Sequence, residues 1–338
     1  MALVVQVVEA GGRRAGAQAP ARGAVFAIKD VGTVKDRYPT ISRIATSSSE
    51  VSIDTNGQVL AMARTRDAPV FGLDVSLQKA RSAAFFSSAA AAAGINGLPN
   101  PTYLNATLAA NGVQFRSVGT GTLSTTVART RAFLGIPTAL ADGAVAFSDR
   151  AIGNLARPFY PDGIFGTAAG PFSNEFESWS PFDVGLQLDL VYSQVALHVA
   201  HYLNQAGLAL FLDGQPLAPA PTAANPVPLP DIGFNCTGVP SLANGIQIFP
   251  GAVPIYRGST LIGAVGVSGD GIDQDDMIAF LGANNAGTKS AGIGNAPSTV
   301  RSDQLVVQIT GAGVRLRYVG CPFAPFLDTS EQNVCQGR

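Results

Sequence analysis

The only two histidines of the chain, His198 and His201, are the residues best suited to bind a metal ion. They lie three positions apart in a segment with helical periodicity, so they occupy neighbouring faces of one predicted helix. Imidazole is the commonest metal ligand in proteins, and the pair could hold a metal ion or supply an axial ligand to heme. The chain has neither an H-E-x-x-H motif nor the C-x-x-C-H motif of covalent heme attachment. An ordinary place on an amphipathic helix is the alternative interpretation.

A second stretch that could carry chemistry is rich in glycine and ends in acids: "FPGAVPIYRGSTLIGAVGVSGDGIDQDDMIA", residues 249–279. Its glycines follow neither the P-loop pattern nor the dinucleotide-binding pattern. It does not match a calcium loop either, because Ile272 occupies the place of the second acidic ligand. We therefore interpret it as two strands followed by a helix. Asp273 would cap this helix, and Asp275 and Asp276 would lie beside the positive end of its dipole.

Other catalytic patterns have little support in this sequence. Glu175, Glu177 and Asp183 cluster around Trp179 and could resemble the paired carboxylates of a glycosidase. Their proline-rich surroundings favour solvated loop residues instead. The chain also lacks the G-x-S-x-G motif of serine hydrolases.

Cys321 and Cys335 bracket the segment "CPFAPFLDTSEQNVC", and we predict a disulfide between them. Such a bridge would close a loop of about fifteen residues and contribute about 3 kcal/mol of stability. It would imply an oxidising compartment, periplasmic or extracellular. Three free thiols in a cytosolic protein are the alternative, and Cys236 is left over or pairs with one of the other two. No basic n-region of a signal peptide is visible at the given start.

Charge is scarce in this chain of 338 residues. The 22 basic and 23 acidic residues give a net charge of -1, and charged residues make up 13% of the sequence, against about a quarter in an average soluble domain. No basic block would follow a phosphate backbone, so nucleic acid is not expected as a partner. No run approaches the roughly 20 apolar residues of a transmembrane helix. We expect so weakly charged a surface to be covered in part by a partner or a second copy.

Short-range patterns predict several elements. The Asn56-Gly57 pair predicts an antiparallel hairpin of residues 50–54 and 58–64, because both turn positions need positive φ. A helix is expected over residues 75–90, with Asp74 as its N-cap. A second helix is expected where apolar residues recur at alternating steps of four and three positions, because this spacing places them on one face. That face consists of Val184, Leu188, Val191, Val195, His198 and Tyr202.

The composition changes along the chain and indicates its organisation. We expect a partly irregular N-terminal extension, residues 1–49; an α+β domain in two pieces, residues 50–93 and 246–320; a Pro/Gly-rich insertion with one amphipathic helix, residues 94–245; and a C-terminal tail, residues 321–338. So long a coil-rich insertion normally has a role in binding or assembly.

Two blocks of this sequence resemble the GlcG/HbpS family, the heme-binding or PduO-C-like proteins formerly called DUF336. The first block, "VSIDTNGQVLAMARTRDAPVFGLDVSLQKARSAAFF", carries D-x-x-G from Asp54 to Gly57 and K-A-x-x-A from Lys79. The second block is segment 249–279, with its V-P-I and G-A-V-G-V-S-G motifs and an acidic helix start. The long separation of the two blocks distinguishes this chain as a variant with a large insertion.

The resemblance implies an α+β fold, in which an antiparallel sheet is flanked by helices. It also implies a tendency to oligomerise and, in some members, the binding of heme or a corrinoid. We expect five residues of the two blocks to contribute to a ligand site: Lys79, Gly251, Pro254, Gly266 and Ser268. The glycines would let a flat ligand approach the backbone.

The first functional hypothesis is a non-enzymatic protein that binds a small ligand, heme or a related tetrapyrrole. The ligand would lie in a cleft between the sheet and the insertion, with His198 and His201 as the available imidazoles. The second hypothesis is a structural or assembly subunit that forms a homo-oligomer or part of a larger complex. An enzyme on a small organic substrate is a third and weaker alternative.

Overall fold

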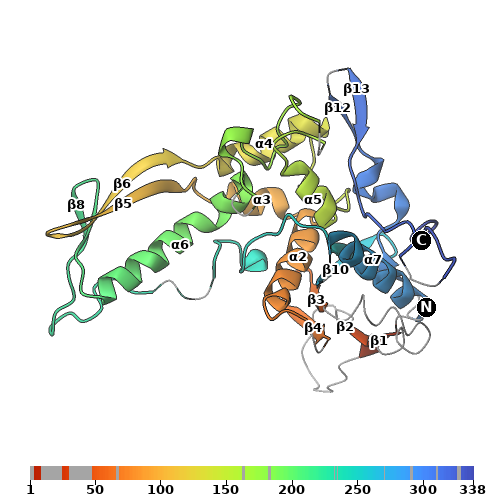
Figure 1. Cartoon of the computed structure of the whole chain (residues 1–338), viewed down its shortest axis with the longest axis horizontal. Coiled ribbons are helices and arrows are strands. Elements are labelled where there is room, and N and C mark those ends of the chain that lie inside the picture. Colours follow the sequence, from red (N-terminus) through yellow and green to blue (C-terminus); the bar gives the residue numbers. More distant parts are fainter. Residues whose placement is uncertain are drawn as a thin grey trace, which may run out of the picture.

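The computed structural model describes residues 4–8, 25–29 and 48–338, with gaps at 66–67, 162–163, 182–183, 232, 234, 270, 290–291, 310 and 326–328. The described part is an α+β fold with largely antiparallel sheets and flanking helices, as the sequence predicts; one strand pair of the second sheet is parallel. Within it, no helix is both long and apolar enough to cross a membrane. Figure 1 shows a body built around one sheet and an arm that extends from it.

The body contains a five-stranded antiparallel sheet with the strand order β11-β9-β10-β3-β4. Its strands are β3 (Ser49–Asp54), β4 (Val59–Arg64), β9 (Ala252–Arg257), β10 (Thr260–Ser268) and β11 (Ile293–Asn295). The predicted hairpin of β3 and β4 is confirmed. Its turn is held by Asp54, whose carboxylate accepts hydrogen bonds from the amides of Asn56 (2.8 Å) and Gln58 (2.9 Å). Strands β1 (Val4–Val8) and β2 (Val25–Lys29) pair antiparallel with each other.

Helices α2 (Gly72–Phe86) and α7 (Ile272–Lys289) cover opposite faces of this sheet, as Figure 1 shows. Successive residues of a strand point to opposite faces. Along β10, Ala264 packs with the alanines of α2, whereas Val265 and Val267 belong to the core around α7. Helix α2 begins three residues before the predicted start at 75 and ends at Phe86 rather than at residue 90.

Small residues on the α2 face let the helix lie close to the sheet. A Cβ atom on Gly266 would lie 2.0 Å from the carbonyl oxygen of Ser76 and 2.7 Å from the nitrogen of Ala80. The backbone of α2 therefore occupies the space beside this glycine. The sequence analysis assigned that space to a flat ligand, and the structure fills it with helix packing instead.

The segment between the two halves of the sheet contains far more regular structure than the sequence analysis expected. It holds α3 (Ala91–Asn96), α4 (Leu123–Leu134), α5 (Asp149–Leu155), α6 (Gly185–Gln205) and a second sheet. Its side chains also form the largest apolar cluster together with Phe86 of α2. The prediction of a single helix in this insertion was therefore wrong. Part of the segment completes the body.

The arm consists of α6 and a four-stranded sheet, and Figure 1 shows it extending to the left of the body. The sheet has the order β5-β6-β7-β8, with β5 (Thr102–Ala109), β6 (Gly112–Thr120), β7 (Leu210–Leu212) and β8 (Gln215–Ala218). At the base of the arm, buried Asp189 accepts hydrogen bonds from the Tyr103 hydroxyl and the Thr122 amide. These contacts attach α6 to β5 and to the start of α4.

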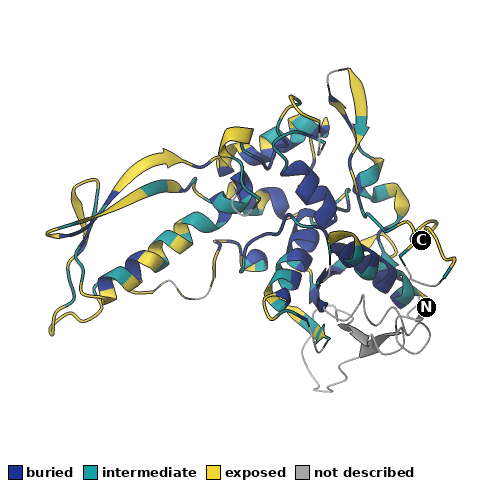
Figure 2. Ribbon diagram, viewed as in Figure 1, coloured by how far each residue is buried: buried dark blue, intermediate teal, exposed yellow. Residues whose placement is uncertain are grey.

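The predicted apolar face of α6 is buried at one end of the helix and exposed at the other. Val184, which precedes the helix, is fully buried, but Val195 is 48% exposed and Tyr202 is 55% exposed. Figure 2 shows the same change from buried to exposed along the helix. The apolar stripe of α6 thus continues beyond the body.

The last part of the chain forms a hairpin and a bridged segment. Strands β12 (Val306–Ile309) and β13 (Ala312–Arg315) pair antiparallel. A disulfide joins Cys321 to Cys335 in the structure, and Cys236 is a free, exposed thiol. The remaining helical turns are single 3₁₀ turns at Phe176–Ser178, Pro240–Leu242, Ser298–Val300 and Ser302–Gln304.

We predict that Gly266→Ala destabilises the protein by about 3 kcal/mol, because the added Cβ has to push α2 away from β10. Urea unfolding followed by circular dichroism measures the change. Gly119→Ala is the matched control in another strand, since its Cβ would meet only Tyr103 at 3.7 Å. Equal stabilities of the two variants would contradict the close packing of α2.

Candidate functional site

Charged side chains from three helices meet at the end of β10. The ammonium of Lys79, on α2, donates to the Val267 carbonyl at 2.8 Å and to the Asp275 carboxylate at 2.9 Å. Lys79 is only 2% exposed. A cation buried to this extent has to be paired and hydrogen bonded, and Asp275 at the start of α7 meets that need. This ion pair joins the two helices on opposite faces of the sheet.

Arg150 extends the cluster to α5. Its guanidinium donates to the buried Asp276 carboxylate at 2.5 Å and also contacts Asp273. The amide of Gly320 donates to the same oxygen of Asp276 at 2.9 Å. The segment that follows β13 is thereby held against the start of α7. Gly320 has no side chain at this point, and a Cβ there would lie 2.6 Å from the guanidinium carbon of Arg150.

Asp149 is the unusual member of this cluster. It is completely buried, and neither carboxyl oxygen has a hydrogen-bond partner among the described residues. Burial raises the pKa of Asp149 well above its ordinary value; the nearby charge of Lys79 opposes this rise, and that of Asp276 adds to it. Burial also raises the pKa of Asp276 to about 6, although Arg150 lowers it in part. Burial therefore disfavours the ionised form of both carboxyls.

The acids at the start of α7 do more than the sequence analysis expected of them. Asp273 lies within the first turn of the helix rather than before it, and it contacts Arg150. Asp275 and Asp276 are buried ion-pair partners, not only charges beside the helix dipole. Their partners come from distant parts of the sequence, so local spacing does not predict these ion pairs.

The five predicted ligand residues are only partly brought together. Lys79 and Gly251 meet, because a Cβ on Gly251 would lie 2.7 Å from the ammonium nitrogen. Ser268 is buried at the end of β10, next to the carbonyl that accepts from Lys79. Gly266 packs against α2, and Pro254 is a buried position of β9 opposite Ala264. In this arrangement the residues contribute to the packing of the sheet. The ammonium of Lys79 is already hydrogen bonded to Val267 and Asp275.

The two histidines are oriented by one neighbouring segment. The Nδ1 of His198 lies 2.8 Å from a carboxylate oxygen of Asp231, and the Nδ1 of His201 lies 2.7 Å from the carbonyl oxygen of Leu229. Both acceptors require Nδ1 to carry the proton, which leaves Nε2 as the nitrogen able to bind a metal. A histidine that ligates a metal is typically held in this way. Both rings also pack edge-on against Tyr202.

His198 and His201 lie on the outer half of α6, which Figure 1 places in the arm. The Lys79 cluster lies in the body, between α2 and α7. The two histidines therefore do not lie beside the body sheet, where the expected cleft would need them. Among the described residues, no group of three or more His, Cys, Asp or Glu side chains could hold a metal ion.

The sequence analysis missed Asp149, Arg150 and Asp231. Asp149 and Arg150 follow Ser148, whose hydroxyl accepts from the amide of Ala151 and caps α5. A Ser-Asp pair at this point is a helix-start signal that the sequence does contain. Asp231 gives no such signal, because it lies 33 residues from its histidine.

The fold and the site thus define an α+β protein with a closed ion-pair cluster in the body and candidate ligand groups on an arm. Residues 227–284 match the family described as "Haem degrading protein HbpS-like". The match confirms the resemblance to the GlcG/HbpS family over this small part of the chain, from the coil before β9 into α7. Because that family is associated with heme, it supports a heme-related small ligand in general terms. No curated protein and no solved structure matches the chain.

We predict that Asp149→Asn stabilises the protein at neutral and alkaline pH. Because the pKa of Asp149 is raised in the folded state, its contribution to stability is present below the unfolded pKa of about 3.9 and is lost as the pH rises. The variant has no carboxyl to ionise. Its free energy of unfolding should therefore equal that of the wild type near pH 4 and exceed it at pH 8.

Urea unfolding at pH 4, 6 and 8 measures this difference. Asp276 titrates within the same range and its charge acts on Asp149, so the difference between the two curves reports the carboxyl of Asp149 together with this interaction. A variant less stable than the wild type at pH 8 would show instead that Asp149 is ionised and stabilised by Lys79.

Proposed function

We propose that the protein binds heme or a related tetrapyrrole on the outer half of α6, with the Nε2 of His198 as the axial ligand. The observation that carries this proposal is the fixed orientation of His198, whose Nδ1 faces the Asp231 carboxylate at 2.8 Å. A carboxylate behind an imidazole sets its tautomer and raises its basicity as a ligand. The His198 side chain is 42% exposed, so a flat ligand can reach it.

The surface around His198 suits an apolar macrocycle. Val195 and Tyr202 lie three and four residues from His198 and share its side of the helix, and Val199 lies on the neighbouring side, four residues from Val195 and three from Tyr202. The exposed fractions of Val195, Val199 and Tyr202 are 48%, 47% and 55%. Covering these side chains with a flat apolar ligand would remove their apolar surface from water, at about 25 cal/mol for each Å².

His201 has a supporting part in this proposal. It is only 5% exposed, and its Nδ1 donates to a main-chain carbonyl. A buried imidazole cannot receive a large ring without rearrangement of the helix. Its edge-on contact with Tyr202 instead helps to position the aromatic ring beside His198.

The family match supports the same assignment. Leu229 and Asp231, which orient the two histidines, both lie inside the matched segment 227–284. The heme-related segment of the chain thus contacts the only imidazoles that the chain contains.

The prediction is that hemin added to the purified protein gives a shifted Soret band that saturates at one equivalent. His198→Ala should abolish the shift, because it removes the axial nitrogen. Asp231→Ala should keep a Soret shift but weaken binding about 10- to 100-fold, since the imidazole loses its orienting partner. Absorption titration measures both effects.

Ser193→Ala is the control, because Ser193 is exposed on α6 away from the apolar stripe. It should bind hemin as the wild type does. An unshifted spectrum for the wild type, or an identical titration for His198→Ala, would overturn the assignment.

A second candidate function is assembly through the arm as a homo-oligomer. The observation in its favour is the apolar surface of the arm outside α6: Leu108 is 78% exposed and Val118 is 63% exposed. Large apolar side chains left exposed to this extent favour contact with a partner. An oxidising compartment, periplasmic or extracellular, goes with either function and is supported by the disulfide of the C-terminal segment.

We expect light scattering of the concentrated protein to give a mass that is a multiple of 34.7 kDa. The double variant Leu108→Glu and Val118→Glu should return it to the monomer mass, because a carboxylate at an apolar contact is costly to bury. Thr107→Glu, next to Leu108 and also exposed, is the control. A monomeric wild type would exclude this second function and leave the heme proposal intact.

A further inference from the structure

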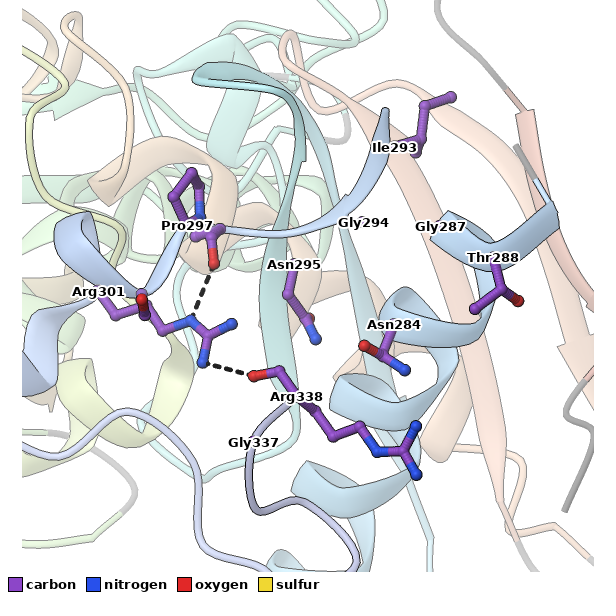
Figure 3. Close-up of a pocket in the computed structure, with 12 residues that line it drawn as sticks. Asn284, Gly287, Thr288, Ile293, Gly294, Asn295, Pro297, Arg301, Gly337 and Arg338 are labelled. Atoms are coloured by element: carbon purple, nitrogen blue, oxygen red, sulfur yellow. Dashed lines mark hydrogen bonds between the residues drawn. The ribbon is translucent and has the colours of Figure 1, made fainter. Parts of the chain in front are cut away.

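A separate cavity of about 730 Å³ lies on the far side of the body from the arm. Figure 3 shows it between the second half of α7, strand β11 and the last residues of the chain. Its polar lining side chains are Asn284, Thr288, Asn295, Ser298, Arg301 and Arg338. None of the described residues that form the candidate heme site contributes to this lining.

The side chains that line the cavity are positively charged on balance. Two arginines line it, and no acidic residue is among the lining residues. Arg301 donates to the main-chain oxygens of Ala296 (2.9 Å) and Arg338 (3.0 Å), which are drawn as dashed lines in Figure 3. Within the described part of the chain, neither guanidinium forms an ion pair with an Asp or Glu side chain. A group of opposite charge would complete this lining.

Aromatic rings hold the Arg301 guanidinium in place. It lies over the ring of Phe280 at 5.0 Å and the ring of Tyr318 at 5.4 Å. A guanidinium fixed by stacking keeps its remaining N–H groups pointing in set directions, so little side-chain freedom is lost when a ligand binds. The guanidinium of Arg301 is therefore already in a fixed position before a ligand binds.

Neutral polar groups complete the lining. Asn284 and Thr288 are four residues apart on one side of α7, and Asn295 faces them from β11 (Figure 3). The Asn284 amide makes no hydrogen bond to another described residue. Its donors and acceptor are thus available to a molecule in the cavity.

We propose that this cavity binds a small organic anion through a carboxylate or phosphate group placed between Arg301, Arg338 and Asn284. Oxyanions are the groups that guanidinium and amide donors recognise together. A volume of about 730 Å³ is in the usual range of small-molecule sites and is much larger than a bare phosphate needs. The anion therefore has an organic body of metabolite size.

The disulfide positions one wall of this site. The Cys321–Cys335 bridge anchors the chain three residues before Arg338. Two main-chain hydrogen bonds support the same segment, from Asn333 to Phe323 and from Gln336 to Asn333, both at 2.9 Å. We expect the site to be complete in the oxidised protein and to lose Arg338 when the bridge is reduced.

Isothermal titration calorimetry of the oxidised full chain with malate, glycerol 3-phosphate and inorganic phosphate tests the proposal. At least one of the two organic anions should bind with saturation and more tightly than inorganic phosphate. Binding of malate alone identifies a carboxylate site, and binding of glycerol 3-phosphate alone identifies a phosphate site. No saturable binding of either organic anion would overturn the proposal.

Variants locate the binding. Arg338→Ala and Asn284→Leu should each weaken it about tenfold, the first by removing a charged donor and the second by removing the side-chain amide donor. The control is Arg315→Ala, an exposed arginine of β13 that donates to the Asp303 carbonyl outside the cavity. Unchanged affinity in both test variants, or the same affinity after reduction of the disulfide, would overturn the assignment. Hemin titrations of these variants should match the wild type, so the two sites can fail independently.

Discussion

The buried ion pair of Lys79 with Asp275 determines how the helices of the body are arranged. A buried ammonium needs both charge and hydrogen-bond partners, and removing one member of such a pair costs about 3–5 kcal/mol. Asp275 can reach Lys79 only if α7 starts at the end of β10, close to α2. Gly251 leaves the necessary room beside the ammonium. Asp276 then pairs with Arg150 and brings in α5, so charges at one strand end connect three helices.

The same constraint explains why this cluster is not the ligand site that the family resemblance led us to expect. Lys79 and Gly251 are adjacent, but the ammonium donates to Asp275 and to the Val267 carbonyl. A ligand would have to replace partners that stabilise the fold. The residues of the two sequence blocks thus maintain the architecture of the sheet, and the candidate ligand groups lie elsewhere.

Local chemistry made part of the fold predictable, and other local signals were overlooked. The Asn56-Gly57 turn predicted its hairpin correctly. The Asp213-Gly214 turn, which joins β7 to β8 with positive φ at both positions, offers a signal of the same kind in the supposed coil. Helix α4 was hidden because Thr126 and Thr130 are buried; each hydroxyl donates to the carbonyl four residues earlier, so a polar residue occupies an apolar position. Contacts such as that of Asp231 with His198 form only in the folded chain, so the spacing of residues in the sequence does not predict them.

The exposed half of α6 follows from the way the arm is built. The side of the helix that bears Ala200 packs with Val113, Phe115 and Leu210 of the arm sheet, and this small core supports the helix outside the body. The opposite side carries the continuation of the buried stripe, and among the described residues it remains open to solvent. The arm's own core does not include these stripe residues, so polar side chains at the same positions would leave its packing unchanged. The stripe is apolar and contains an oriented imidazole, which are the two properties that the proposed tetrapyrrole ligand would require.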